Sequence, residues 1–325
     1  MKTPIIDLSI IIVSFNTRAE TRECLKSIRE NAKNINYETF VVDNDSKDGS
    51  ADMVAFEFPN VQLIRHSVNK GFAGGNNPAL EKAKGRYVLL LNSDALLTRN
   101  ALRKALDYMN KNPRVGVLGG KLKNPDGTLQ PSARMLPGPI NKILHLTGLA
   151  SRFSKSKWFG RADFSWWDHS KPLSVGWVVG AFFLVRKETL NEIGFLDERY
   201  FLYFEEIDFC LRVRRAGWDV VCYPQVEIIH WGGKSSSSVS KELSEKGNQL
   251  VPIRIKSEFR YYSKWYGAMA VLVSAGIEIL WNTAVIIKNS FNRSSKSERK
   301  RIKAFDQIQI IFETLVDDRL GRGNV

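Results

Sequence analysis

The sequence predicts an α/β fold in which helices cover both faces of a mainly parallel central sheet. Short β-branched runs alternate with helical stretches along the first half of the chain. The runs at residues 10–13 and 88–91 are apolar on both faces, as expected for central strands buried between helices. Polar residues directly follow several runs, at the sheet edge where ligands bind in folds of this kind.

The expected elements follow this alternation. Strands are expected at residues 8–13, 39–42, 61–65, 87–91, 115–118 and 175–185, and helices at residues 187–193 and 205–216. Residues 123–171 contain scattered prolines and clustered aromatic side chains, which favour a long loop on the substrate side. From residue 241 onward the composition becomes helical, basic and aromatic.

Composition and charge limit the class of protein. A chain of 325 residues that is 43% hydrophobic can bury a large core. Its three cysteines form no close pair, which favours a reducing compartment, and the apolar N-terminal run lacks the small-residue cleavage site of an export signal. The net charge of +14 indicates an anionic partner, which could be nucleic acid, lipid headgroups or a phosphorylated substrate.

Two polar loops at predicted strand ends suit a nucleotide. Residues 43–50 contain three carboxylates and a glycine; plain turn chemistry explains them, but Asp43 can also accept the imide N–H of a pyrimidine base. Residues 69–77 are rich in glycine and are expected to precede a helix, where backbone amides can approach phosphates. Their spacing fits neither GxGxxG nor a P-loop, which disfavours a nicotinamide dehydrogenase and leaves a simple glycine-rich connection open.

Asp94 is the first candidate metal ligand, because it follows the apolar run at residues 88–91 at the expected rim of the sheet. Mg²⁺ and Mn²⁺ prefer oxygen ligands, commonly one or two carboxylates plus substrate phosphates. A turn or N-cap role before a helix near Thr98 is the alternative. His230 closes a later strand beside glycines and is a candidate for metal or phosphate, although a lone histidine is more often structural.

Three acids open the helix expected at residues 205–216. Asp208 lies four residues before Arg212, so an intrahelical ion pair explains this acid. Glu205 and Glu206 have no basic partner at that spacing. One of them can therefore serve as the general base on an acceptor hydroxyl.

Taken together and in this order, these segments resemble family 2 glycosyltransferases with the GT-A fold, and among them a rhamnosyltransferase-like group. The motifs that carry the resemblance lie at residues 9–16, 41–50, 69–77, 89–95, 180–186, 194–218 and 230–233. The resemblance implies a glycosyltransferase domain at residues 1–240, with a nucleotide-sugar half at about 1–122 and an acceptor half at about 123–240. A helical, basic region at residues 241–325 would follow it.

The resemblance also implies roles for individual residues. Glu206, with its neighbour Glu205, occupies the position of the catalytic base, where aspartate is usual. Asp94 is the last acid of a DxD-type motif whose first position is Asn92, and it would hold Mg²⁺ or Mn²⁺ together with His230 and the donor diphosphate. The donor-binding residues are Ser14, Asn16, Asp43, Asp45, Gly71, Phe72, Ala73, Gly74, Asn76 and Asn92, and the acceptor-binding residues are Trp177, Gly180 and Ala181.

The implied reaction is inverting transfer of a sugar from a nucleotide diphosphate to a hydroxyl of a glycan or polyprenyl-linked cell-surface polysaccharide precursor. The resemblance favours rhamnose from dTDP-rhamnose, and a UDP-hexose remains open. The alternative of another class is a basic surface-binding protein whose acids serve only as turns and caps. That alternative explains the charge and not the motifs, and no nucleic-acid partner is expected.

The C-terminal region suggests contact with a membrane. Residues 268–287 are long enough to span one, but Glu278 disfavours spanning because a charge near the centre of a span costs roughly 2.5 to 3.5 kcal/mol. Glu278 forms one polar stripe with Ser274 and Asn282, which favours an interfacial or dimer-forming helix. Packing of this helix on the catalytic domain is the alternative, and a homodimer remains open. The basic run at residues 293–301 favours a membrane surface or is a solvated face. We expect a cytoplasmic protein, peripheral to the inner face of the membrane.

Overall fold

The computed structural model describes residues 6–232, 250–292 and 294–323, and the chain divides into two compact units. The first unit comprises the described residues of Met1–Leu136, Trp167–Phe201 and Glu205–Asn248, and the second those of Pro137–Trp166, Leu202–Phe204 and Gln249–Val325. The boundary predicted near residue 240 lies outside the described residues. Residues 137–166, which the sequence assigned to the acceptor half, group with the C-terminal helices.

The first unit is built on a mixed, mostly parallel sheet, as the sequence predicted. The strands of the unit are β1 (Leu8–Ser14), β2 (Tyr37–Asp43), β3 (Gln62–Arg65), β4 (Tyr87–Leu91), β5 (Ala95–Leu97), β6 (Val115–Lys123), β7 (Leu129–Gln130), β8 (Ala133–Arg134), β9 (Leu173–Ser174), β10 (Trp177–Val178), β11 (Phe182–Arg186) and β12 (Asp219–His230). The main order is β3-β2-β1-β4-β11-β6-β12-β5, and β8 pairs with β10 separately. Strand β11 runs antiparallel between β4 and β6, and β5 runs antiparallel to β12.

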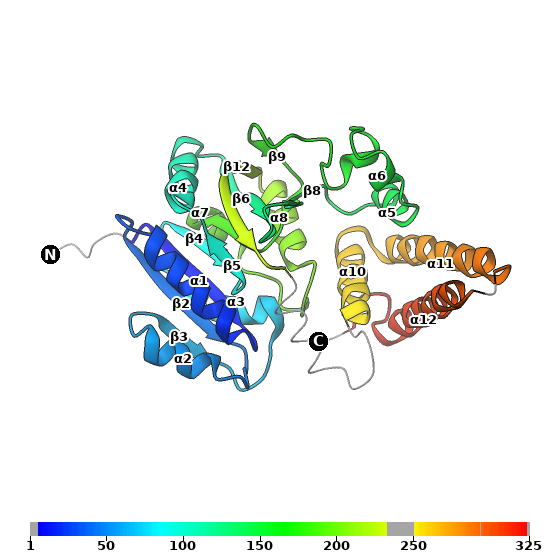
Figure 1. The fold of residues 1–325 in the computed structure, drawn as a ribbon, viewed down its shortest axis with the longest axis horizontal. Coiled ribbons are helices and arrows are strands. Elements are labelled where there is room, and N and C mark those ends of the chain that lie inside the picture. Colours follow the sequence, from blue (N-terminus) through cyan, green and yellow to red (C-terminus); the bar gives the residue numbers. More distant parts are fainter. Residues whose placement is uncertain (1–5, 233–249, 293, 324–325) are drawn as a thin grey trace. The chain divides into compact units, whose positions relative to one another are not determined.

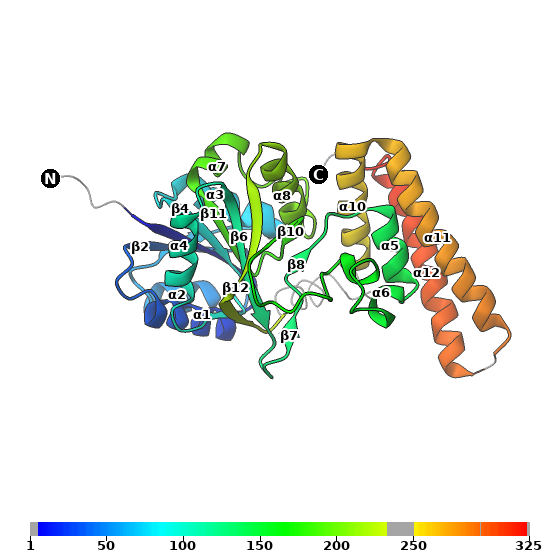
Figure 2. The same ribbon diagram turned by 90° about the horizontal axis from the view of Figure 1, so that it is seen from above.

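Helices cover both faces of this sheet. They are α1 (Arg18–Asn31), α2 (Ser50–Glu57), α3 (Gly71–Lys82), α4 (Ala101–Lys111), α7 (Lys187–Ile193) and α8 (Glu205–Arg215). Figure 2 shows α1, α2 and α4 on one side and α3, α7 and α8 on the other. Alternate side chains of β11 therefore enter different cores: Phe182 joins the cluster under α1, α2 and α4, whereas Phe183 packs against Phe209 of α8.

The topology brings several chain segments to one edge of the sheet. Strands β1, β2 and β4 are mutually parallel, as are β6 and β12, so their carboxyl ends lie on the same side. Strand β11 is antiparallel to β4 and pairs Phe182 with Leu91, so the residues just before β11 also lie there. Helix α8 leads directly into β12 and packs on it, which directs the N-terminus of α8 to this edge as well.

Three local predictions need correction. The glycine-rich segment at residues 69–77 does not precede a helix, because α3 already begins at Gly71 and even contains Pro78. The strand predicted at residues 175–185 is interrupted between β10 and β11. The stretch at residues 123–171 is not a single loop, since it contains β7, β8 and helical segments.

The second unit is helical in its described part (Figure 1). It contains α5 (Pro139–Leu146), α6 (Leu149–Arg152), the 3₁₀-helix Phe159–Arg161, α10 (Leu250–Tyr266), α11 (Ala268–Ser290) and α12 (Ser295–Asp317). Helix α11 packs on α5, α10 and α12. Its polar stripe of Ser274, Glu278 and Asn282 is buried. The stripe therefore lies inside this helical unit, and contact of α11 with a membrane or a partner helix stays a prediction.

Candidate active site

Asp94 and His230 lie side by side although 136 residues separate them in the sequence. Strand β5, directly after Asp94, pairs antiparallel with β12 so that Ala95 is opposite His230. As a result, His230 Nε2 lies 3.2 Å from Asp94 Oδ1, and both side chains are buried. The side-chain amide of Asn92 lies 3.3 Å from the same ring nitrogen. Asp94 is not an N-cap, because α4 begins at Ala101 after Asn100, but it does lie in a turn, between β4 and β5, as the turn alternative expected.

Gln130 supports His230 from the other side of its ring. Its Oε1 lies 2.6 Å from His230 Nδ1. Because an amide oxygen can only accept, Nδ1 carries a proton and Nε2 is directed toward Asp94. Sequence reasoning missed Gln130, since nothing in its neighbourhood distinguishes it and the segment was expected to be a loop. Gly233, the last residue of the predicted motif at residues 230–233, lies outside the described residues.

The donor set of this pair fits a divalent cation. The carboxylate oxygen suits either Mg²⁺ or Mn²⁺, whereas the imidazole nitrogen, whose ring is held by a second hydrogen bond, suits the transition metal Mn²⁺ better than the harder Mg²⁺. Within the part of the chain that the structure describes, no three His, Cys, Asp or Glu side chains gather into a metal site. Among the described residues, Asp94 and His230 are the two candidate donors, and substrate phosphate oxygens would complete the coordination.

Asp43 presents an unused acceptor at the end of β2. The side chain is 4% exposed, and its Oδ2 accepts a hydrogen bond from the Ser46 amide at 3.1 Å. Its Oδ1 is buried and has no hydrogen-bond partner among the described residues. A buried carboxylate oxygen without a partner is costly unless a ligand fills the role. Asp43 Oδ1 is thus available as an acceptor, and its contact with a base N–H stays a prediction.

The turns after β1 and β2 are bound to each other. The backbone amide of Asn16 donates to Ser46 Oγ at 3.0 Å, and the side-chain Oδ1 of Asn16 accepts from the backbone amide of Lys47 at 2.7 Å. Asn16 and Asp45 both have positive φ, of 51° and 70°. Asn and Asp tolerate this region better than most residues, which explains their presence at these corners. The Asp45 carboxylate pairs with exposed Lys47 at 2.6 Å.

Ser14 is buried within a network of hydroxyl groups. Its Oγ lies 3.2 Å from Thr17 Oγ1 and 3.0 Å from Thr21 Oγ1. Thr17 in turn donates to Ser93 Oγ at 3.0 Å. This network joins the ends of β1 and β4. Ser14 therefore stabilises the edge of the sheet, and its contact with the donor stays a prediction.

The glycines of α3 allow close packing. Gly71 has φ of 71°, and a Cβ at this position would overlap the carbonyl oxygen of Phe201. At Gly74 a Cβ would lie 2.8 Å from Lys70 Cβ, and at Gly75 it would lie 2.8 Å from Val13 Cγ1. These glycines bring the first turn of α3 against its surroundings, whereas a role toward phosphates stays a prediction. Ala73 is fully buried, and buried Asn76 donates to the Phe72 carbonyl at 2.9 Å.

Two asparagines that the sequence did not single out hold this turn. Asn44 Nδ2 donates to Asn69 Oδ1 and to the Gly71 carbonyl, at 2.8 and 2.9 Å. Asn77 Nδ2 donates to the Leu196 carbonyl at 2.9 Å and to Glu198 at 2.7 Å. Both asparagines lie within predicted motifs, but their composition alone could not separate them from ordinary turn residues.

The predicted acceptor residues lie beside the predicted donor residues. A Cβ at Gly180 would lie 3.4 Å from the Phe72 ring. The backbone amide of Asn92 donates to the Ala181 carbonyl at 3.2 Å. Trp177 is half-buried, and its indole N–H donates to the Met135 carbonyl at 2.9 Å. Trp177 is thus fixed by the β8–β10 pair.

Glu205 and Glu206 begin α8 after a strained turn. Tyr203 and Phe204 have φ of 69° and 72°, which is rare for aromatic residues. One carboxylate oxygen of each glutamate is buried without a hydrogen-bond partner in the described structure. Burial raises the pKa of Glu206 to about 7. Burial, followed by repulsion from Glu206, raises the pKa of Glu205 well above its usual value.

Asp208 has the structural role that its spacing predicted. Its Oδ2 accepts from Arg212 Nε at 3.0 Å within α8. The same guanidinium donates to the carbonyls of Ile193 and Phe195, both at 2.7 Å. Asp208 and Arg212 therefore anchor the turn after α7, which leaves Glu205 and Glu206 as the acids available for chemistry.

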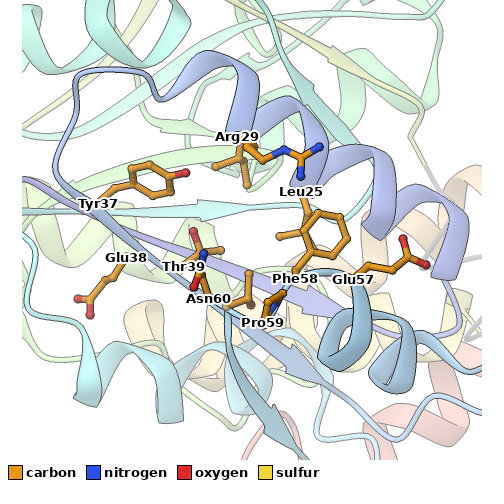
Figure 3. A pocket seen from close by; sticks show the side chains of 11 residues that line it. Leu25, Arg29, Tyr37, Glu38, Thr39, Glu57, Phe58, Pro59 and Asn60 are labelled. Atoms are coloured by element: carbon orange, nitrogen blue, oxygen red, sulfur yellow. The ribbon is translucent and has the colours of Figure 1, made fainter.

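A hollow of about 380 Å³ lies elsewhere, between α1, β2 and the turn after α2 (Figure 3). Leu25, Arg29, Tyr37 and Phe58 are among the side chains that line it. Tyr37 is the first residue of β2. The hollow therefore lies toward the amino end of this strand, away from the edge where Asp43 and Asp94 lie.

Comparison with solved structures defines the fold. The mannosyltransferase PcManGT from Pyrobaculum calidifontis, in complex with GDP-Man and Mn²⁺, aligns with a TM-score of 0.54 at 15% identity, over 95% of this chain and 86% of that chain. GalNAc-T7, with UDP, GalNAc and Mn²⁺, aligns with a TM-score of 0.56 at 13% identity, over 99% of this chain and 59% of that chain. The fold is GT-A, as predicted.

Sequence comparison gives the family. The family model described as Glycosyl transferase family 2 matches residues 9–194, more than half of the chain. The protein belongs to glycosyl transferase family 2.

Two curated relatives are similar over part of their length. N-acetylglucosaminyl-diphospho-decaprenol L-rhamnosyltransferase of Mycobacterium tuberculosis is 30% identical over 201 residues, which are 58% of this chain and 65% of that protein. The low-salt glycan biosynthesis hexosyltransferase Agl10 of Haloferax volcanii is 26% identical over 243 residues, which are 70% of this chain and 68% of that protein. The match therefore spans slightly less than two thirds of the rhamnosyltransferase.

Proposed function

We propose that this protein is an inverting, metal-dependent glycosyltransferase that transfers L-rhamnose from dTDP-rhamnose to a hydroxyl of a lipid-linked polysaccharide precursor. The observation that carries the proposal is a set of polar side chains at the carboxyl edge of the sheet: the buried Asp43, Asp94, His230 and Glu205, and the half-buried Glu206, one of whose carboxylate oxygens is buried. The family assignment supports the reaction class. The name of the Mycobacterium tuberculosis relative supports rhamnose and a polyprenyl-linked acceptor, and a UDP-hexose is the alternative donor.

Each acid has a separate part in this reaction. Asp43 Oδ1 accepts the base N–H of the donor, and Asn16 steadies the turn beside it. Asp94 and His230 would hold Mg²⁺ or Mn²⁺ together with the donor diphosphate. When bound, the cation supplies positive charge that neutralises the departing diphosphate.

Glu206 is the proposed general base. Its carboxylate accepts the proton of the acceptor hydroxyl while the hydroxyl oxygen forms a bond to the anomeric carbon. The bond from that carbon to the diphosphate oxygen breaks at the same time, on the opposite face, so the configuration inverts. The pKa of Glu206, about 7, suits a group that must be ionised before the reaction and protonated after it.

The remaining assignments follow from this scheme. The nucleotide-sugar half, at about residues 1–122, would bind the donor, and Gly180, Ala181 and Trp177 would line the acceptor side. An acceptor with a polyprenyl tail lies in a membrane, so we propose a cytoplasmic enzyme that works peripherally at the inner face of the cell membrane.

A donor screen tests the proposal. The full chain is incubated with dTDP-rhamnose, UDP-sugars or GDP-sugars and Mn²⁺ or Mg²⁺, and donor hydrolysis and nucleotide binding are measured for the wild type, Asp94→Ala and Glu206→Gln. Asp52→Asn serves as a control, because it removes an exposed carboxylate whose partner is Arg65 on β3. We expect metal-dependent turnover of one donor, lost in Asp94→Ala and kept in Asp52→Asn. Absence of binding and turnover with every donor would support the basic surface-binding alternative.

A further inference from the structure

Helix α11 is amphipathic in the opposite sense from a helix on the surface of a soluble protein. Its buried side chains are Val271, Ser274, Ala275, Glu278 and Asn282. Its exposed large apolar side chains include Met269, Val273, Leu280 and Ile287, at spacings of four and seven residues that form one row along the helix. A water-facing helix normally exposes its polar row and buries its apolar row.

Ion pairs inside the helical unit explain why the polar row is buried. Lys142 of α5 lies 2.6 Å from Glu258 and 2.7 Å from Glu278. Arg254 of α10 lies 3.1 Å from each of the same two carboxylates. Ser274 completes the cluster by donating to Glu258 at 2.6 Å. Two cations balance two carboxylates, so this interior tolerates burial.

Helix α12 has the same inverted pattern. Its buried row consists of small or short side chains with one isoleucine: Ser297, Ala304, Ile311 and Thr314. Its exposed apolar residues are larger: Ile302, Phe305, Phe312 and Val316, which are 53% to 76% exposed. Two neighbouring helices thus expose rows of large apolar side chains, which marks an interaction surface. Figure 2 shows α11 and α12 running side by side.

Basic side chains surround the turn between these helices. The exposed ones are Lys288, Lys296, Arg299, Lys300 and Lys303. Between residues 288 and 303 the sequence contains one acid, Glu298, whereas Asp306, Glu313 and Asp317 lie further along α12. A second copy of the chain would bring the same positive charge to this region and be repelled. An anionic lipid surface would instead be attracted to it.

We propose that the α11–α12 hairpin docks on an anionic lipid bilayer, with its apolar rows in the headgroup region and its basic turn on lipid phosphates. The proposal rests on the proposed function only for its purpose, which is to bring the enzyme to a lipid-linked acceptor. By length and composition α11 could cross a membrane. Glu278, however, is paired with Lys142 and Arg254 inside the unit, which favours a helix lying at the interface.

Vesicle flotation with the full chain tests this surface. The probes are phosphatidylcholine vesicles with and without phosphatidylglycerol. The apolar rows are tested by Leu280→Glu and Phe312→Glu, singly and combined. The matched control is Phe56→Glu, the same substitution at an aromatic residue that is 88% exposed on α2 of the other unit. The basic turn is tested by Arg299→Gln combined with Lys300→Gln.

We expect the wild type to float with phosphatidylglycerol-containing vesicles and Phe56→Glu to do the same. The basic-turn variant should bind roughly 25-fold more weakly, because it removes two basic groups and each one near an anionic surface contributes about a factor of five. The Leu280→Glu and Phe312→Glu combination should lose binding. Circular dichroism spectra and donor turnover should match the wild type in all variants, since each change is at an exposed site outside the candidate active site.

Several outcomes would overturn the docking surface. One is that the wild type binds neither kind of vesicle. Another is that the hairpin variants bind vesicles as strongly as the wild type does. A concentration-dependent dimer in analytical ultracentrifugation that Leu280→Glu disrupts, without vesicle binding, would assign the surface to self-association instead. Donor turnover without vesicle binding would refute this inference alone, whereas vesicle binding without any donor turnover would refute the proposed function alone.

Discussion

Gln130 Oε1 lies 2.6 Å from His230 Nδ1 and thereby fixes which ring nitrogen is directed toward Asp94. The two residues are 100 positions apart in the sequence. Residue Gln130 belongs to β7, which pairs with β6, while His230 ends β12, which pairs with β6 from the other side. A short strand in a segment that looked like a loop thus completes the candidate metal site.

Replacing Gln130 by alanine should weaken metal-supported turnover. A lost supporting hydrogen bond to a metal-ligating histidine typically costs roughly 10- to 100-fold in metal affinity or activity. We expect Gln130→Ala to raise the Mn²⁺ concentration that gives half-maximal turnover, with partial recovery at saturating Mn²⁺. Gln130→Glu keeps an acceptor for Nδ1–H and should remain near the wild type. Equal metal dependence in Gln130→Ala and wild type would refute the role.

The rate of sugar transfer should rise with pH through about 7, because only the ionised form of Glu206 can accept a proton. Glu206→Gln should lose roughly 10²- to 10⁴-fold in kcat and lose this dependence in its residual rate. Single-turnover rates between about pH 5.5 and 8.5 measure the profile. A flat wild-type profile would assign the base to another group.

The gain in Tm of Glu205→Gln over the wild type should be larger at high pH than at low pH. The raised pKa of Glu205 means that the folded state disfavours its charged form. Stability from the protonated group is fully present below its usual pKa and is lost as pH rises through the raised pKa. Glutamine does not titrate, so the difference in Tm between variant and wild type should grow from about pH 5 to pH 8. A constant difference would contradict the burial-raised pKa.

Gly71→Ala should destabilise the first unit more than Gly194→Ala does. Both glycines have positive φ, 71° and 79°, and at Gly194 ψ is −173°, a combination that residues other than glycine rarely adopt, so alanine costs about 1–3 kcal/mol in backbone strain at each position. At Gly71 a Cβ also overlaps the Phe201 carbonyl, whereas at Gly194 it meets no atom within 4 Å. Urea unfolding followed by tryptophan fluorescence measures both variants. Equal losses would show that the Phe201 contact yields easily.

Lys142→Met should loosen the helical unit. Among the described residues, the substitution leaves Arg254 as the cation that pairs with both Glu258 and Glu278, and breaking a buried ion pair costs about 3–5 kcal/mol. Lys26→Met, which removes an exposed pair with Glu23, is the control and should change little. Hydrogen exchange of α10 and α11 is the measurement. Unchanged protection in Lys142→Met would show that hydrophobic packing alone holds these helices.

The ion-pair cluster of Lys142, Arg254, Glu258 and Glu278 should lose stability at acid pH, and Glu258 sets where this happens. Burial by itself raises the pKa of Glu258, but Lys142 and Arg254 outweigh burial and the pKa is lowered overall. A lowered pKa gives stability that is present above the usual value of 4.5 and is lost as pH falls through the lowered pKa. Exchange in α10 should therefore accelerate at acid pH in the wild type.

The sequence by itself determined the sheet and the identity of most acids at its edge. Strands β1, β2 and β4 are apolar on both faces because both faces are covered, and that pattern is local. Helix α7 has the bounds that were predicted, and Asp208 pairs with Arg212 because four residues make one helical turn.

Only the tertiary structure decided contacts between residues far apart in the chain. The pairing of β5 with β12 brings His230 to Asp94, and no local pattern records that register. The sequence showed that α11 has a polar stripe. The direction in which the stripe faces depends on Lys142 and Arg254, which lie on other helices and pair with Glu278. A hydrophobic period shows that a helix has two faces. The partners that satisfy or repel each face determine which one is buried.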